Sequence, residues 1–370
     1  MIGVAPLILI ALVALSVLVL VHEFGHYVAA RLSGVWVEEF GIGLPPKLWG
    51  KKIGKTLYSV NALPIGGFVR LHGESAESKI SKPKEAFVNK SKGARAFIAL
   101  AGVFMNFVFA TIAFAIITAF VGIPKGVTIA EVTPDSPASA GKLAPDDRIL
   151  SIGGKEITYT DQFSKTVAQF KGQEVEFVVS RSVNGVQGDI HLPVVIRSQA
   201  PEGEGLLGVL FTPSEIYFPP VWKRPFVYLA QGYIKTVDIS TQIVNGFALM
   251  LTQALGGTAP KGLAGPVAVT AIIAEVAKIG ILPLLEFMAI ISINLAILNL
   301  VPFPPLDGAR VFFILIETVT RKKMVPRIEN MIHSLGMALL LLLMLALTAH
   351  EIPGLLKAGS LAKFVQTIIQ

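Results

Sequence analysis

The sequence contains no cysteine and little charge, and both shortages narrow its chemistry. Without cysteine the chain forms no disulfide and uses no thiol as nucleophile or metal ligand, although this does not identify its compartment. Only 15% of the 370 residues are charged, whereas soluble domains usually carry about a quarter. Hydrophobic residues make up 53% of the chain, and the mean hydropathy is +0.66. These values predict a polytopic α-helical membrane protein and exclude an ordinary soluble domain.

Four apolar runs are long enough to cross a bilayer, which takes about 20 helical residues. They cover about residues 4–30, 96–123, 279–301 and 332–349. The first run has no Lys or Arg before it, so it lacks the charged start of a cleaved signal peptide. Two further stretches, at 234–255 and 267–277, are short or interrupted by charged residues and glycines. We interpret these two as amphipathic or re-entrant pieces beside about four transmembrane helices.

Basic residues gather between the first two runs and again after the third run. By the positive-inside rule both segments face the cytoplasm, so both chain ends lie outside. Residues 124–222 are then extracytoplasmic. The net charge of +7 is explained by basic loops beside lipid headgroups, so the lipid bilayer is an expected partner and nucleic acid is not.

Residues 127–212 are expected to form a small β-rich domain inserted between the second and third spans. Alternating segments at 128–132, 149–152 and 175–181 predict strands. Turns are expected at Gly153-Gly154 and Asn184-Gly185.

The string from Pro134 to Gly141, followed by Asp147 to Gly154, resembles the PDZ signature of bacterial membrane and envelope proteases. PDZ domains bind an extended peptide at a sheet edge and hold its terminal carboxylate with backbone amides. The residues at the place of that carboxylate loop are Leu207, Gly208 and Val209. The alternatives are a strand that only completes the β-domain, and a domain that limits substrates by size.

The first apolar run leads into His22-Glu23-Phe24-Gly25-His26. Histidines four residues apart lie on one face of a helix, so their imidazoles can converge on one Zn²⁺. Glu23 can then act as general base toward a water activated by the metal. Ionisable side chains in a span are costly and are kept mainly for function, which favours a metal site over a polar cluster at a helix end.

Catalytic zinc takes three protein ligands and keeps one position open. Asp307 is the favoured third ligand, because three prolines after the third span end the helix and present it at membrane depth. From spacing alone, an Asp that caps a cytoplasmic helix explains the position equally well. The other histidines, expected to be solvated or interfacial, are His72, His191, His333 and His350.

Together, HEFGH in the first span and NLVPFPPLDG at 299–308 resemble the site-2 protease family of intramembrane zinc metalloproteases. With one PDZ-like domain between the second and third spans, the chain resembles the bacterial branch that performs regulated intramembrane proteolysis of anti-sigma factors. The resemblance implies His22, His26 and Asp307 as zinc ligands, Glu23 as general base, and Asn294 and Asn299 at the substrate strand or the oxyanion.

For each of these two asparagines, a hydrogen bond between membrane helices is the alternative. Gly102 and Asn106 share one face of the second span, and we assign them to close helix packing.

Residues 56–71 alternate like two strands around a turn that contains Pro64, Gly66 and Gly67. This segment resembles the family's membrane-associated β-hairpin. An edge strand beside Gly66 and Gly67 can pair with an unwound substrate by β-addition. The alternative is an ordinary cytoplasmic hairpin.

Four regions are expected: membrane core at 1–123, a PDZ-like domain at 124–215, an amphipathic or re-entrant linker at 216–278, and further membrane core at 279–370. The expected function is zinc-dependent hydrolysis of a peptide bond within or near the transmembrane segment of a single-span protein, either an anti-sigma factor or a remnant signal peptide. The expected place is the bacterial cytoplasmic (inner) membrane, with the active site toward the cytoplasm. The sequence does not define the substrate or the oligomeric state.

The main alternative is a non-enzymatic, PDZ-bearing scaffold or quality-control adaptor with a structural metal site. A metal transporter is disfavoured, because the spans are too apolar between their ends.

Overall fold

The computed structural model describes residues 4–74, 80–183, 186–201, 203–257, 264–321 and 326–369. The chain divides into two compact units, one built from residues 1–117 and 229–370 and the other from residues 118–228. The first is mainly helical and carries a small sheet, and the second is mainly β.

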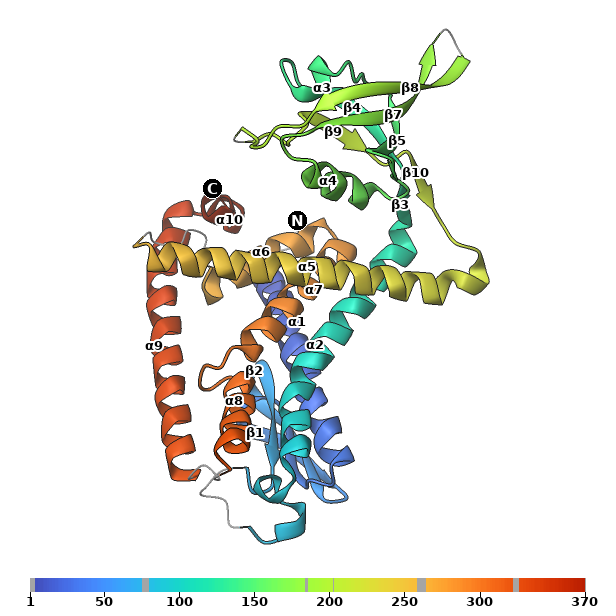
Figure 1. Cartoon of the computed structure of the whole chain (residues 1–370). Helices are drawn as coiled ribbons and strands as arrows, with labels where there is room; N and C mark the ends of the chain where they lie inside the picture. The colour runs from blue at the N-terminus through green and yellow to red at the C-terminus, as the bar shows by residue number, and fades with distance from the viewer. Residues whose placement is uncertain are drawn as a thin grey trace. The chain divides into compact units, whose positions relative to one another are not determined.

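Four helices in the described part of the chain are long and apolar enough to cross a membrane, as the sequence predicts. They are α1 (Val4–Leu32), α2 (Lys92–Val121), α7 (Ile281–Leu300) and α9 (Pro326–Ala358) (Figure 1). Many of their outward side chains are Leu, Ile, Val and Phe, for example Leu9, Phe104 and Leu342. Such side chains suit contact with lipid tails, and the helical backbone satisfies its own polar groups there.

The two stretches interpreted as amphipathic or re-entrant form α5 (Arg224–Leu255) and α6 (Pro266–Ile279). Helix α6 packs against α1 and α7, and also against α10 (Leu361–Ile369). Gly280, at φ 149°, separates α6 from α7. The buried carboxylate of Glu351 on α9 accepts hydrogen bonds from the backbone N–H groups of Gly265 (2.5 Å) and Val267 (3.1 Å). This carboxylate satisfies donors that a helix start leaves free.

Helix α8 (Asp307–Thr320) follows the proline-rich loop after α7. Its far end is tied to the first turn of α2, because Lys92 Nζ donates to the Glu317 carbonyl (3.0 Å) and Arg95 pairs with the buried Glu317 carboxylate. The sequence analysis did not predict this helix. Its anchoring holds the segment that begins with Asp307 beside α2.

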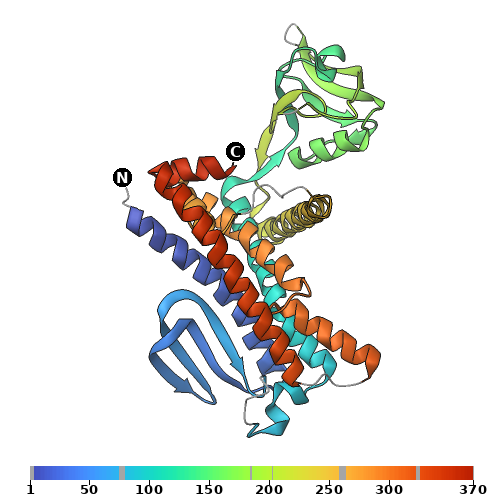
Figure 2. The ribbon, with the colours of Figure 1, turned by 90° about the vertical axis from the view of Figure 1, so that its left-hand side faces the viewer.

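The strands β1 (Val37–Ile53) and β2 (Thr56–Leu71) form a sheet beside α1 (Figures 1 and 2). The prediction that the two halves of 56–71 pair with each other around a Pro/Gly turn is wrong. Both halves pair with the first part of β1, on its opposite sides, so that Gly41 lies opposite both Ser59 and Phe68. The second part of β1 then pairs with 56–60, where Trp49 lies opposite Val60.

Contacts with α1 explain why residues 63–66 do not form a hairpin turn. They form a segment that leads the chain from one side of β1 to the other, the crossing segment. Ser16 Oγ donates to the Pro64 carbonyl (2.8 Å) and accepts from the Gly66 N–H (3.3 Å). Pro64 has no N–H to offer a neighbouring strand, and Gly66 adopts φ 76°. As a result, residues 67–71 form one edge of the sheet.

The second unit contains a sheet with the strand order β8-β7-β5-β4-β9, and β6 pairs with β5. Its strands are β4 (Val127–Val132), β5 (Arg148–Ile152), β6 (Lys155–Glu156), β7 (Glu174–Val183), β8 (Val186–Val195) and β9 (Val209–Thr212). The unit also holds helices α3 (Pro137–Ala140) and α4 (Thr160–Gln169), and a separate pair, β3 (Ile123–Lys125) with β10 (Glu215–Tyr217).

The predicted strands at 128–132, 149–152 and 175–181 fall within β4, β5 and β7, so these three predictions are confirmed. The turn predicted at Gly153-Gly154 joins β5 to β6, with φ of 56° and 76°. The other predicted turn, Asn184-Gly185, lies outside the described residues. Helix α4 was not predicted from the sequence.

Candidate metal centre

The two histidines of HEFGH lie where α1 crosses α2 at very close range. A Cβ placed on Gly25 would lie 2.3 Å from the Ala101 carbonyl oxygen, so only glycine permits this approach. The crossing buries His22 and His26, which are 8% and 9% exposed. Their imidazoles therefore meet the face of α2 and are largely shielded from solvent.

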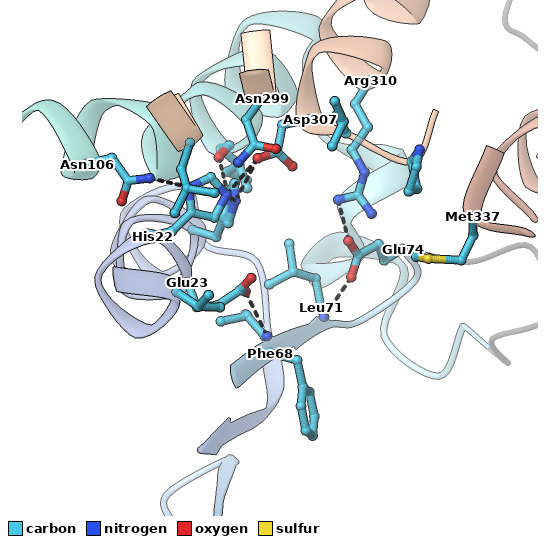
Figure 3. Close-up of a pocket in the computed structure, with 17 residues that line it drawn as sticks. His22, Glu23, Phe68, Leu71, Glu74, Asn106, Asn299, Asp307, Arg310 and Met337 are labelled. Atoms are coloured by element: carbon cyan, nitrogen blue, oxygen red, sulfur yellow. Dashed lines mark hydrogen bonds and ion pairs between the residues drawn. The ribbon is translucent and has the colours of Figure 1, made fainter. Parts of the chain in front are cut away.

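Asp307, 285 residues after His22 in the sequence, reaches both histidines from the start of α8, after the loop that follows α7 (Figure 3). Its Oδ2 lies 2.9 Å from His22 Nε2 and 3.2 Å from His26 Nε2. A Cβ on Gly308 would lie 2.3 Å from the Val301 carbonyl oxygen, so glycine allows α8 to start directly against the end of α7. The N-cap residue of α8 is Leu306, and the Asp307 side chain points to the histidines. Helix capping therefore does not explain its position.

The donor atoms are spaced as a zinc ion requires. In a tetrahedral site with bonds of about 2.0–2.1 Å, neighbouring donors are about 3.3 Å apart. Here the two histidine Nε2 atoms are 3.1 Å apart, close to their 2.9 and 3.2 Å separations from Asp307 Oδ2. Among the described residues, this is the one group of three or more potential metal ligands. Two imidazoles and one carboxylate fit catalytic zinc, which leaves a coordination position open.

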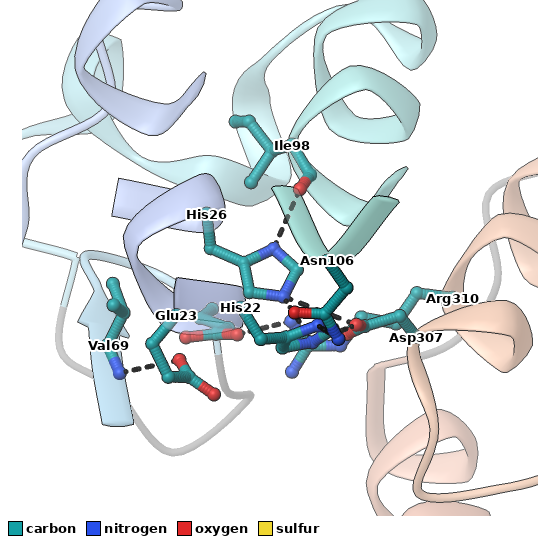
Figure 4. A network of polar contacts seen from close by, with 9 residues as sticks. His22, Glu23, His26, Val69, Ile98, Asn106, Asp307 and Arg310 are labelled. Carbon is teal, nitrogen blue, oxygen red and sulfur yellow. Dashed lines mark hydrogen bonds and ion pairs between the residues drawn. The ribbon is translucent and has the colours of Figure 1, made fainter. Parts of the chain in front are cut away.

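Helix α2 contacts both imidazoles through Ile98, Gly102 and Asn106, which are spaced by four along one face. Figure 4 shows Ile98 and Asn106 beside the two histidines. A histidine that binds a metal through Nε2 keeps its proton on Nδ1, and that N–H needs an acceptor. For His26 the acceptor is the Ile98 carbonyl oxygen at 2.8 Å. Gly102 provides the room, because a Cβ there would lie 2.5 Å from His26 Nε2.

Asn106 is the corresponding partner of His22. Its amide lies 3.4 Å from His22 Nδ1, and its side-chain oxygen is buried without a hydrogen-bond partner among the described residues. Turning the amide about its Cβ–Cγ bond brings this oxygen to Nδ1 and gives the Nδ1–H its acceptor. The unpartnered oxygen therefore fits a His22 that binds metal through Nε2. The earlier assignment of Gly102 and Asn106 to helix packing missed these contacts with the histidines.

Replacing Asn106 with Leu is expected to weaken zinc binding by about 10- to 100-fold, the usual cost of losing a partner that orients a ligand. The Asn106→Asp variant keeps an acceptor at His22 Nδ1, so its zinc affinity should stay near wild type. Competition with a chromogenic chelator measures both affinities. Asn294→Leu on α7 is the matched control. Equal zinc affinity in Asn106→Leu and wild type would contradict the role of Asn106.

The charge on Asp307 also suits a metal ligand. Burial alone would raise the pKa of this carboxyl, but the adjacent imidazoles of His22 and His26 outweigh burial and hold the pKa well below its usual range. Asp307 is therefore ionised at neutral pH, the form in which a carboxylate binds metal.

A cavity of about 480 Å³ opens beside the three ligand candidates. Glu23 and Asn299 both line it. Glu23 Oε2 accepts a hydrogen bond at 3.0 Å from the backbone N–H of Val69, which lies on the edge strand of the β1–β2 sheet (Figure 4). The cavity thus brings the base candidate, the ligand candidates and a strand edge together.

Asn294, Gly66 and Gly67 do not line this cavity. The two glycines pack on α1, where a Cβ on Gly67 would lie 2.7 Å from Leu20 Cδ2. Of the residues expected to contact substrate in this unit, only Asn299 is therefore beside Glu23.

The remaining histidines lie apart from the three ligand candidates. The expectation that His72 is solvated or interfacial is wrong, because it is 1% exposed, its Nδ1 lies 2.7 Å from Glu38 Oε1 and its ring packs against the Trp36 ring. His191 is exposed and pairs with Glu176 in the second unit. His350 is exposed on α9, and His333 on the same helix contacts the Phe313 ring.

In the second unit, Leu207 and Gly208 form the turn that leads into β9 at Val209. Leu207 is buried, and its carbonyl oxygen accepts from the Ala138 N–H at 3.0 Å. The Gly208 N–H donates to the Gly205 carbonyl oxygen at 3.2 Å.

Two charged residues of the cavity were missed by the sequence analysis. Glu74 and Arg310 line it and form an ion pair. Glu74 follows the β-rich segment 56–71, and Arg310 is three residues after Asp307. A helix that starts at Asp307 places Arg310, three residues later, on the same face as Asp307, and this was the available signal. The sequence analysis did not recognise α8.

Comparison with known proteins shows the family to which the chain belongs. The sequence profile of peptidase family M50 matches residues 10–343. A Clostridium perfringens protein named as a candidate zinc metalloprotease is 36% identical over 346 residues, covering 93% of this chain and 98% of that protein. Zinc metalloprotease RasP of Geobacillus kaustophilus is 28% identical over an alignment of 418 residues, covering 92% and 96%. The chloroplastic membrane metalloprotease ARASP of Arabidopsis thaliana is 33% identical, covering 93% and 78%. The chain belongs to peptidase family M50, the site-2 protease family, and is a multi-pass membrane metalloendopeptidase that uses zinc.

Proposed function

We propose that this enzyme hydrolyses a peptide bond within or near the transmembrane segment of a single-span membrane protein. The observation that carries the proposal is the convergence of His22, His26 and Asp307 in a cavity between membrane-spanning helices. An anti-sigma factor or a remnant signal peptide is the proposed substrate class, with the cut made near the cytoplasmic side of the bacterial inner membrane.

In this proposal His22, His26 and Asp307 would hold the metal beside the cavity. When bound, zinc supplies a Lewis acid that polarises the scissile carbonyl and activates water. Glu23 takes the proton from the attacking water and passes it to the leaving amine. Asn299, at the end of α7, lines the same cavity and donates its side-chain N–H to the substrate carbonyl or strand.

The substrate must be unwound before its backbone can reach these groups. A transmembrane helix buries its own peptide bonds, and an unwound segment in lipid needs new hydrogen-bond partners. The edge strand at 67–71 offers such partners, because β-addition pairs the backbone of an extended peptide with a sheet edge. Helix α5 is not among the four helices that are long and apolar enough to cross a membrane. We propose that it lies along the membrane surface, near the point where the substrate enters.

Basic loops support an orientation in which residues 31–95 and 310–327 face the cytoplasm, with the second unit on the other side. We propose a PDZ-like role for that unit. Its β9 is an edge strand, and Phe211 on β9 contacts Phe163 on α4, as expected for a peptide site between a strand and a helix. Capture of a peptide carboxylate by the Gly208 N–H requires its bond to Gly205 to open. Limiting substrates by the size of their extracytoplasmic part requires no such change.

The proposal is tested by substrates whose transmembrane helix unwinds more easily at the cut site. Two glycines in place of two leucines at the cut site of a single-span substrate are expected to raise the cleavage rate about 15- to 30-fold, because each glycine weakens a helix by about 0.8–1 kcal/mol. Mass spectrometry of the products from purified enzyme measures the rate and maps the cut. The same two glycines placed one and a half helical turns or more outside the cut site are the control. Equal rates for all three substrates would contradict cleavage of an unwound segment.

A further inference from the structure

The edge strand beside the metal centre is capped by two carboxylates. The Val69 N–H donates to Glu23 Oε2 (3.0 Å), and the Leu71 N–H donates to Glu74 Oε2 (3.1 Å) (Figures 3 and 4). Backbone groups two residues apart in a strand point to the same side. These are therefore two of the N–H groups that an added strand would use, and both are occupied.

Helix α8, which begins with Asp307, holds the Glu74 side chain in place. Its other carboxylate oxygen, Oε1, pairs with Arg310, and both residues line the cavity. Glu74 and Arg310 are only 20% and 33% exposed, so the pair is partly shielded from water. A charge-assisted hydrogen bond in such a setting is stronger than one between neutral groups. Through its two carboxylate oxygens, Glu74 thus connects the Leu71 N–H of the sheet to Arg310 of α8.

We propose that Glu74 blocks the substrate-binding edge, and that an incoming substrate strand must displace it, together with Glu23, before it can pair with the edge at 67–71. This inference rests on the proposed function, because it assumes that substrate is held by β-addition. An extended segment can bond to the edge only if its own carbonyl oxygens take the N–H groups of Val69 and Leu71. The two carboxylates compete for the same donors.

The competition has a different consequence for each carboxylate. Once displaced from Val69, Glu23 is free to turn to the attacking water, so the base is released when the substrate strand is in place. Once displaced from Leu71, Glu74 retains its ion pair with Arg310. Loss of Glu74 should therefore ease substrate binding without removing any group that takes part in the chemistry. A role for Glu74 in folding alone predicts no such gain.

The kinetic test compares wild type with Glu74→Ala and Glu74→Gln on one single-span substrate. We expect Glu74→Ala to lower KM about 3- to 10-fold, the effect of removing one competing hydrogen bond of about 1 kcal/mol, with kcat within about twofold. Glu74→Gln keeps an acceptor for Leu71 and should fall between the two. The matched control is Glu85→Ala, which removes a carboxylate paired with Lys55 outside the cavity. An unchanged or raised KM in Glu74→Ala would overturn the proposal.

Hydrogen exchange tests the cap even where activity is absent. In Glu74→Ala the Leu71 amide should exchange at least about tenfold faster than in wild type, while the Val69 amide should not change. In the double variant Glu23→Gln and Glu74→Ala, adding the substrate should restore protection at Leu71. Unchanged Leu71 exchange, or no protection by substrate, would overturn the inference. Absence of cleavage by wild type would instead contradict the proposed function, so the two failures are distinguishable.

Discussion

Replacing Glu23 with Gln is expected to lower the rate of peptide-bond cleavage by about a thousandfold, within the range for loss of a general acid–base. Zinc should remain bound. The reason is the division of roles in the cavity: the three clustered donors come from His22, His26 and Asp307, whereas the Glu23 carboxylate contacts the Val69 N–H. Gln has the same shape and can accept that hydrogen bond, but it cannot take a proton from water at neutral pH.

The measurement is cleavage of a single-span substrate by detergent-solubilised protein, with zinc content determined by atomic emission on the same samples. The matched control is Glu286→Gln, the same change at an exposed position of α7 outside the cavity. It should cleave at the wild-type rate. Full activity in Glu23→Gln would refute the assignment of the base, and loss of zinc from this variant would indicate that Glu23 is a ligand.

Replacing Asp307 with Ala should weaken zinc binding by more than about a hundredfold, beyond the usual cost of losing only a partner that orients a ligand. Activity should fall with it. Asp307 supplies the one carboxylate oxygen within 3.2 Å of both histidine Nε2 atoms in the described structure. Without it, two imidazoles remain buried beside each other with no negative partner at that position. Catalytic zinc with only two protein ligands is not expected to be held.

Equilibrium dialysis against buffered zinc measures the affinity of the Asp307→Ala variant. The matched control is Asp238→Ala on α5, which removes a carboxylate outside the cavity and should bind zinc as wild type does. Thermal unfolding of both variants separates a local loss of metal from general misfolding. Stoichiometric zinc in a folded Asp307→Ala protein, at the wild-type affinity, would show that the third ligand lies elsewhere.

The local part of the candidate metal site could be predicted from the sequence because it depends on helix geometry. Four-residue spacing places His22 and His26 on one face of any helix. Asp307 could be proposed from its proline-rich setting, but spacing alone could not separate a ligand from a helix cap. That distinction required the close start of α8 at Gly308 and the tie between Glu317 and α2. These are contacts between segments far apart in the sequence.

The β1–β2 sheet was predicted with the wrong pairing for a physical reason. Residues 37–53 contain glycines, two adjacent prolines and several lysines, which are poor strand signals. Without β1, the two halves of 56–71 had no partner but each other. In the structure β1 lies between them, and Ser16 of α1 binds the crossing segment. The pairing is therefore decided by tertiary contacts that the alternating pattern does not contain.

Asn106 and Glu74 show a second limit of sequence analysis. Each has a plain local interpretation, a polar residue in a span and an acid in a basic loop. Their roles follow from what they face, His22 in one case and the Leu71 N–H with Arg310 in the other. Such pairs become visible only after α1, α2 and α8 are assembled.

The alternative of a non-enzymatic scaffold with a structural metal site is not supported. A structural zinc site has its coordination completed by protein ligands, whereas the described residues gather three donors beside a cavity of about 480 Å³. Membership in a metalloprotease family, over residues 10–343, supports the enzyme.

The most direct test of the central claim is the position of the cut. Purified wild-type enzyme in liposomes would be incubated with one single-span substrate, and the products identified by intact mass. We predict two fragments whose new ends lie within or next to the transmembrane segment, formed by wild type and not by Glu23→Gln. Intact substrate, or cuts only in parts remote from the membrane and equally frequent with both proteins, would contradict intramembrane proteolysis by this metal centre.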